Sequence, residues 1–89
     1  MYYLMMQQEV ADYDTWRKVF DSMESVRRSM GVQNDLILRG ADNPQAITLL
    51  IEWDNLDNAR RWMADPRLSE ALKEAGVLKP PTITYLRGG

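Results

Sequence analysis

The chain has 89 residues and a formal net charge of −2, from 11 basic and 13 acidic side chains, and it contains neither cysteine nor histidine. This length predicts one domain with a thin core. The interleaved charges exclude a basic surface for nucleic acid or anionic membranes. The missing residue types exclude disulfides, thiolate nucleophiles and the most common ligands of zinc and haem, so no metal site is expected. With no apolar run of ~20 residues and no basic start of a signal peptide, we expect a cytoplasmic domain.

The first predicted element is a strand at about residues 2–10. Successive side chains of a strand point to opposite faces. One face would carry Tyr2, Leu4, Met6 and Val10, and the other Tyr3 and Met5. Apolar side chains on both faces indicate a strand that is covered on both sides.

A helix is predicted next, over residues 13–30, with Asp12 as its N-cap. Gly31 suits the left-handed conformation that often follows a helix. Apolar residues recur at spacings of three and four, at Trp16, Val19, Phe20, Met23, Val26 and Met30. They form one stripe that faces the core, and we expect the charged residues between them, Arg27 included, to lie mostly off it.

Two strands and a second helical region complete the pattern. Residues 32–39 and 46–53 are strand-like and flank the turn sequence GADNPQ, which predicts an antiparallel hairpin. A helix at about residues 56–64 follows, then a second that begins at Asp65-Pro66 and stops at Gly76. The last strand is expected at residues 82–87.

The order strand, helix, two strands, helix, strand is that of a ferredoxin-like α+β domain over residues 1–89. Its sheet is antiparallel and its helices cover one face. The other face also carries apolar side chains, and an exposed patch of that kind usually marks an interface. We therefore predict a two-fold symmetric homodimer in which one sheet faces the other.

Three segments carry a resemblance to a known family: ADYDTWRKVFDSM, EWDNLDNARRWMADPRLSEALKEAGV and PPTITYL. They resemble the dimeric α+β barrel superfamily, and within it the antibiotic biosynthesis monooxygenase-like domains. In WMADPRLSEAL, Trp62, Leu68 and Ala71 match the family's Trp, apolar and Ala positions. The haem-degrading branch has its axial histidine where this chain has Leu72, so we reject haem and expect no cofactor.

The resemblance implies a small cofactor-independent monooxygenase acting on an aromatic or polyketide-like molecule. A deprotonated, electron-rich substrate can itself react with dioxygen, so the protein has to bind an aromatic plane, handle a proton and stabilise an anion. The alternative is a non-catalytic dimeric module that binds a small ligand or is only structural.

Trp16, Phe20 and Trp62 are the candidates for substrate binding. Large aromatic side chains on the inner face of a helix are more often core than pocket, so core packing leads and a pocket wall is the alternative. Trp53 closes the third predicted strand and could lie at the dimer seam, and packing is the favoured role.

Asn34, Arg39 and Tyr85 are the catalytic candidates. Asn34 lies within a strand, where it either lines a polar pocket or faces solvent at a sheet edge. Arg39 either pairs with a substrate anion or extends to water, as strand-end arginines usually do. The Tyr85 phenol either donates a proton or hydrogen bond to substrate or lies across the dimer seam.

Overall fold

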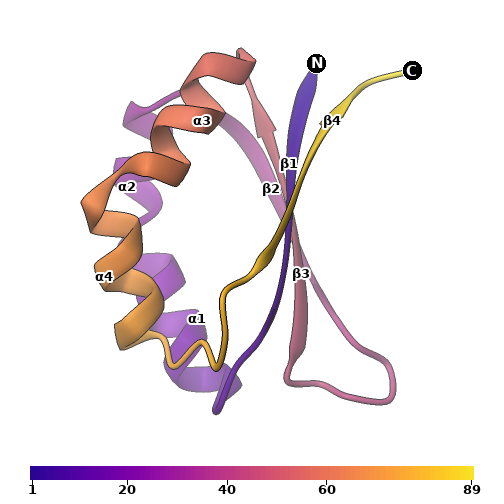
Figure 1. The fold of residues 1–89 in the computed structure, drawn as a ribbon, viewed down its shortest axis with the longest axis vertical. Helices are drawn as coiled ribbons and strands as arrows, with labels where there is room; N and C mark the ends of the chain where they lie inside the picture. Colours follow the sequence, from indigo (N-terminus) through magenta and orange to yellow (C-terminus); the bar gives the residue numbers. More distant parts are fainter.

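The computed structural model describes residues 1–89 and has one sheet with all its helices on a single face (Figure 1). The antiparallel strands are β1 (Tyr2–Glu9), β2 (Val32–Arg39), β3 (Ala46–Trp53) and β4 (Thr82–Arg87), in the order β2-β3-β1-β4. The helices are α1 (Tyr13–Ser22), α2 (Glu24–Ser29), α3 (Leu56–Ala64) and α4 (Pro66–Glu74). This is the predicted ferredoxin-like α+β fold. None of the helices has the length and apolar character that a membrane span requires.

The helix starts and stops agree with the sequence signals. Asp12 and Asn55 cap α1 and α3 by accepting backbone N–H bonds, and Asp65 does the same for α4. Gly31 and Gly76 have positive φ angles of 111° and 74°, the backbone region that glycine occupies without a steric penalty. These local interactions therefore set the element boundaries.

The first helical region is interrupted, which corrects the expectation of one helix over residues 13–30. The chain leaves α1 at Met23, where side chains use two carbonyl oxygens that a continuous helix would need. Ser22 Oγ donates to Val19 O at 2.6 Å, and Arg27 Nη1 donates to Phe20 O at 2.6 Å. Such competition for backbone acceptors bends or breaks helices. Arg27 is consequently held against the core and is only 3% exposed.

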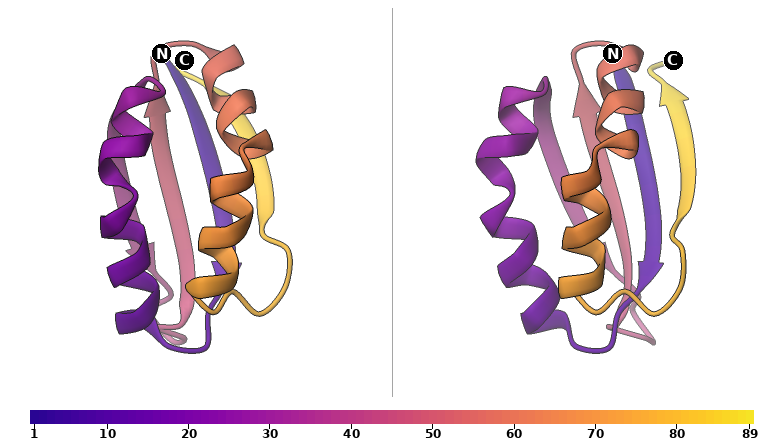
Figure 2. Two further views of the ribbon diagram at one scale, coloured as in Figure 1. Left: turned by 90° about the vertical axis from the view of Figure 1, so that its left-hand side faces the viewer. Right: turned by 60° about the vertical axis from the view of Figure 1, so that its left-hand side comes forward.

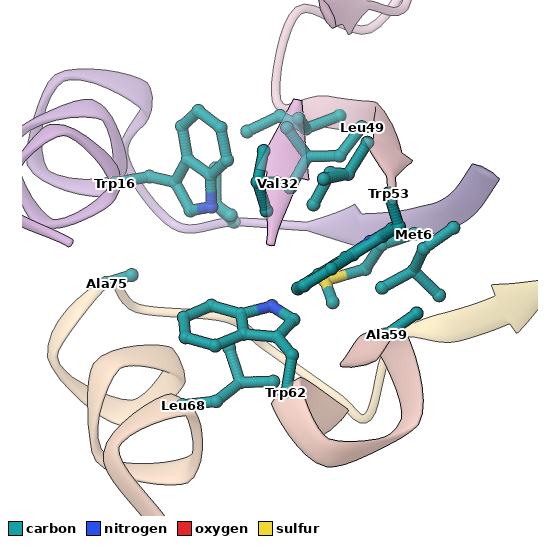
Figure 3. Packing of buried hydrophobic residues seen from close by; sticks show 13 residues of the cluster. Met6, Trp16, Val32, Leu49, Trp53, Ala59, Trp62, Leu68 and Ala75 are labelled. Carbon is teal, nitrogen blue, oxygen red and sulfur yellow. The ribbon is translucent and has the colours of Figure 1, made fainter. Parts of the chain in front are cut away.

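The hydrophobic core lies between the helices and the sheet (Figures 2 and 3). Figure 2 shows α1 and α2 running beside α3 and α4 along the strands. The sheet contributes Leu4, Met6, Ile47, Leu49, Ile51 and Trp53, and the helices contribute Trp16, Ala59, Trp62 and Leu68. Trp53 is 0% exposed, so the expectation that it packs is confirmed.

The opposite face of the sheet has no helix over it (Figure 1). Paired residues of an antiparallel sheet share a face, and Leu36 pairs with Leu50, which pairs with Met5. Leu36 and Leu38 are 51% and 49% exposed. The two-sided apolar pattern of the sequence is confirmed, and one of its sides is uncovered in the single chain.

Candidate functional site

A cavity of about 40 Å³ lies in the core between the helices and the sheet. Fourteen residues from β1, β3 and all four helices line it, and twelve of them are hydrophobic. The other two are Gln8 on β1 and Arg27 on α2. The cavity has room for roughly two or three water molecules, and its walls are apolar apart from these two side chains.

Aromatic side chains form two walls of this cavity. Trp16 stacks on Phe20 along α1, with ring centroids 5.1 Å apart and an interplanar angle of 19°. Trp62 approaches from α3, on the other side of the core (Figure 3). The structure thus brings the three predicted substrate-binding residues together at one cavity. Trp16 and Trp62 are also deeply buried, so both side chains pack in the core and border the cavity, and substrate binding by these residues remains a prediction.

Three buried polar atoms of cavity-lining residues have no hydrogen-bond partner: Gln8 Oε1, Arg27 Nε and Trp62 Nε1. Figure 3 shows the Trp62 nitrogen on the ring edge that faces the centre of the core. Buried polar groups are almost always paired, and leaving one unpaired costs about 1–3 kcal/mol. A polar ligand in the cavity would offer these atoms partners, and the fourth such atom of the core, Trp53 Nε1, belongs to a residue outside the cavity lining.

Arg27 is the only ionisable residue at the cavity. Its guanidinium carbon lies 3.6 Å from the Phe20 ring centroid, and its Nε is 3.5 Å from Asp35 Oδ2, an ion pair too long for a good hydrogen bond. Burial lowers the pKa of Arg27 from its ordinary value, while the Asp35 carboxylate opposes this shift. The expectation that Arg27 lies off the apolar stripe is wrong: its spacings of seven from Phe20 and four from Met23 put it on that stripe, and only its charge suggested an exposed position.

Gln8 was missed as well. Strand alternation puts it on the same face as Leu4 and Met6, so the pattern itself shows that its amide faces the helices. It is 7% exposed. A polar residue at a core position of a strand is the signal that could have found it.

The three catalytic candidates do not come together. Asn34 is exposed on β2 and faces away from the helices. Arg39 lies at the end of β2, with its guanidinium 3.6 Å from the Tyr13 ring centroid. Tyr85 is exposed on the edge strand β4, and its ring centroid lies 5.4 Å from the guanidinium carbon of Arg60. None of the three lines the cavity, and their catalytic role remains a prediction.

A surface groove of about 340 Å³ adjoins the cavity. It lies between α1 and α4 and shares Val19, Met23 and Ala71 with the cavity lining. Methionine is unbranched and adapts to irregular spaces, so Met23 lies where a small side-chain movement would join groove and cavity. The three shared residues therefore separate the cavity from the groove.

No group of three or more His, Cys, Asp or Glu side chains comes together in a metal-binding arrangement. No carboxylate lines the cavity either. The arrangement therefore offers apolar contact, hydrogen bonding and one positive charge, and it offers no side chain that is an ordinary general base.

No protein-family model matches the chain, and no curated protein matches its sequence. Solved structures do match. A candidate antibiotic biosynthesis monooxygenase from Bordetella bronchiseptica aligns with a TM-score of 0.84 and 15% identity, over 99% of this chain and 96% of that one. SnoaB, a cofactor-independent oxygenase from Streptomyces nogalater, aligns with a TM-score of 0.80 and 15% identity, over 99% and 92%.

The chain has the antibiotic biosynthesis monooxygenase-like fold. Rv0793 from Mycobacterium tuberculosis shares it, with a TM-score of 0.69 and 14% identity over 99% of this chain and 95% of that one. The resemblance expected from the sequence is thus confirmed for the fold. Identity this low does not transfer an activity or the roles of residues.

Proposed function

We propose that this protein binds a small planar aromatic molecule between its helices and sheet and promotes the reaction of that molecule with dioxygen without a cofactor. The observation that carries the proposal is an apolar cavity bordered by Trp16, Phe20 and Trp62, whose lining residues include three with an unpartnered buried polar atom. Apolar walls with a few polar groups are typical of small-molecule sites. The fold shared with SnoaB, a cofactor-independent oxygenase, supports the same reaction class.

Binding requires the cavity to widen, because about 40 Å³ is too small for a fused-ring ligand. The lining includes Met6 and Met23, whose flexible side chains move at low cost. Movement of Met23 would add space from the groove between α1 and α4. A ring entering there would slide between Trp16 and Trp62, which offer offset stacking to an aromatic plane.

The polar groups would orient the ring. The Trp62 indole N–H is a donor only, so it would donate to a carbonyl or phenol oxygen of the ligand. The unpartnered atom of Gln8 is Oε1, an acceptor, so it would accept a hydrogen bond from a hydroxyl of the ligand. Because neither atom has a partner in the chain, each such bond replaces an unsatisfied group and favours binding.

The chemistry would consist of oxidising a ring methylene to a carbonyl. The substrate gives up one methylene proton to form an electron-rich anion, which transfers electrons to dioxygen. One oxygen atom forms the new C=O bond, and the other leaves as water with the two methylene hydrogens. Dioxygen is the only oxidant. The protein contributes orientation and stabilisation of the anion.

We further propose that the protein works as a two-fold homodimer through the uncovered sheet face. Leu36, Leu38 and Leu86 are exposed on this face, which is charged only at Glu9 and Glu52 among the paired positions of the four strands. A self-complementary apolar face suits an isologous interface. Native mass spectrometry should show a dimer that Leu36→Lys converts to monomer, and a monomeric wild type would contradict the interface.

A non-catalytic ligand-binding module is the second candidate. It is favoured by one observation, the lack of a carboxylate or other ordinary base among the cavity-lining residues. Such a module would bind the same aromatic class and leave it unchanged, so the two candidates differ only in turnover.

Anthrone is a suitable probe because its ring methylene can be oxidised to a carbonyl. Quenching of tryptophan fluorescence measures binding, and an oxygen electrode with product detection measures conversion to anthraquinone. Binding with oxygen uptake well above the uncatalysed rate supports the enzyme. Binding alone supports the module, and no binding contradicts both.

Two tryptophans make a matched pair for assigning the site. Trp62 lines the cavity and Trp53 is equally buried without lining it. We expect Trp62→Phe to weaken anthrone binding, and Trp53→Phe to lower stability while leaving binding unchanged at temperatures where the variant is folded. Equal loss of binding in both variants would show that the effect comes from core packing.

A further inference from the structure

We infer that the molecule bound in the cavity is an anion, a phenolate or carboxylate, whose charged oxygen lies against Arg27. The inference rests on the proposed function, because it takes the cavity as a binding site. It adds the charge of the ligand and the residue that selects it, neither of which follows from the shape of the cavity.

Arg27 is a cation that the fold holds in the core with few partners. Only 3% of it is exposed, and it lines the cavity. Its one hydrogen bond runs from Nη1 to Phe20 O at 2.6 Å. Nε is buried and makes no hydrogen bond, since its ion-pair partner Asp35 Oδ2 at 3.5 Å is beyond the usual range for a charged hydrogen bond.

A buried charge is strongly destabilising unless it is paired and hydrogen-bonded. The backbone oxygen of Phe20 and the Phe20 ring face stabilise one side of the guanidinium. The Asp35 side chain is 26% exposed, so solvent weakens its attraction. An anionic oxygen from the cavity would complete the pairing, and a guanidinium binds such oxygens in its planar fork.

The position of Arg27 also sets the direction of the ligand. Trp16 and Phe20 on α1 and Trp62 on α3 provide the apolar walls, whereas the guanidinium comes from α2, beside Phe20. An aromatic acid would therefore place its rings between the tryptophans and its acidic oxygen toward the α1–α2 break. A nearby positive charge also lowers the pKa of a bound phenol, which favours the anion at a site without a base.

The opposing explanation is that Arg27 only ties the helix break together through Phe20 O. Both explanations expect Arg27 substitution to lower stability, so stability does not separate them. The preference of the site for a charged over a neutral ligand separates them, because a purely structural arginine gives no such preference.

The test compares 2-naphthoate with 2-naphthamide, which have the same rings and differ in charge at neutral pH. Their dissociation constants are measured on the full chain by quenching of tryptophan fluorescence. We expect wild type to bind the carboxylate at least about tenfold more tightly, because a charged acceptor makes a stronger hydrogen bond than a neutral one. Equal binding of the two overturns the inference and leaves the proposed function standing. Binding of neither overturns both.

Variants then assign the preference to this residue. Arg27→Met should bring the ratio of the two constants close to one, and Arg27→Lys, which keeps the charge without the fork, should retain part of it. Arg28→Met is the matched control, because Arg28 is exposed and pairs with Glu24 on the helix surface. An unchanged ratio in Arg27→Met overturns the inference. If Arg27→Met does not fold, Arg27→Gln is measured at a temperature at which it is folded, and an unchanged ratio in that variant overturns the inference.

Discussion

Filling the cavity should stabilise the protein and block ligand binding at the same time. Ala71 on α4 lines both the cavity and the adjoining groove, so Ala71→Leu adds a branched apolar group to that wall. An empty volume of about 40 Å³ at about 24 cal/mol per Å³ corresponds to about 1 kcal/mol. Leucine is nearly as good a helix former as alanine, so the backbone cost is small. For a domain of this size the gain corresponds to a rise of about 4–8 °C in Tm.

Urea denaturation and thermal unfolding measure the stability, and quenching by anthrone measures binding in the same samples. Ala64→Leu is the control, because it makes the same change at an exposed position of α3 and should stay within about 0.5 kcal/mol of wild type. A stabilised Ala71→Leu variant that still binds anthrone normally would refute the assignment of the cavity as the binding site. Destabilisation by about 1–3 kcal/mol would instead mean that the space is already filled.

Three further predictions concern stability and are checked by urea denaturation. Trp53→Ala should cost about 3–5 kcal/mol, because the ring is fully buried; a loss below 1 kcal/mol would contradict its place in the core. Gly31→Ala should cost at least about 1 kcal/mol, since φ is 111° and a Cβ would collide with the Asp54 side chain; an unchanged stability would contradict this backbone geometry. Hydrogen bonds from the Thr15 hydroxyl and backbone N–H lower the pKa of Asp12. The charged cap therefore stabilises the folded state fully above the unfolded-state pKa of about 3.9. This stabilisation is lost as the pH falls through the lower folded-state pKa. The stability difference between wild type and Asp12→Ala should therefore be larger at pH 7 than at pH 3, and a constant difference would contradict a charged cap.

The sequence predicts most of the fold because local signals and periodicity agree along the chain. Caps such as Asp12 and Asp65 and the glycines after the helices mark boundaries that the structure reproduces. The alternation in β1 and β3 separates a covered face from an uncovered one. When every local preference supports one arrangement of elements, the fold can be predicted from patterns alone.

The candidate site is only partly predictable, because it includes a charged side chain at a buried position. Trp16, Phe20 and Trp62 follow from helix periodicity, and all three line the cavity. Arg27 shares that periodicity, seven residues after Phe20 and four after Met23, but a charged side chain is almost never fully buried unless it is paired, so its residue type predicts an exposed position. The partners that permit its burial, Phe20 O and the Asp35 carboxylate, are set by the folded structure and are not visible in the sequence pattern.

The catalytic candidates show a second limit. Asn34, Arg39 and Tyr85 are chemically suitable residue types, but suitability does not place them in one site. The register puts Asn34 on the uncovered face, and Arg39 and Tyr85 lie on different edge strands. Convergence of side chains is a property of three-dimensional packing, and a single sequence carries little information about it.

The energetics of so small a core give the strongest reason to regard the cavity as functional. An 89-residue domain has a net stability of only about 5–15 kcal/mol. Gln8 Oε1 and Trp62 Nε1 are each buried without a partner, at about 1–3 kcal/mol apiece, and the empty volume adds about 1 kcal/mol. A leucine at position 8 and a phenylalanine at position 62 would remove both unsatisfied atoms. Trp53 Nε1 is a further unpartnered atom away from the cavity, but the other costs coincide at the cavity, where a ligand would compensate for them. The same ligand should raise the Tm of wild type more than that of Ala71→Leu.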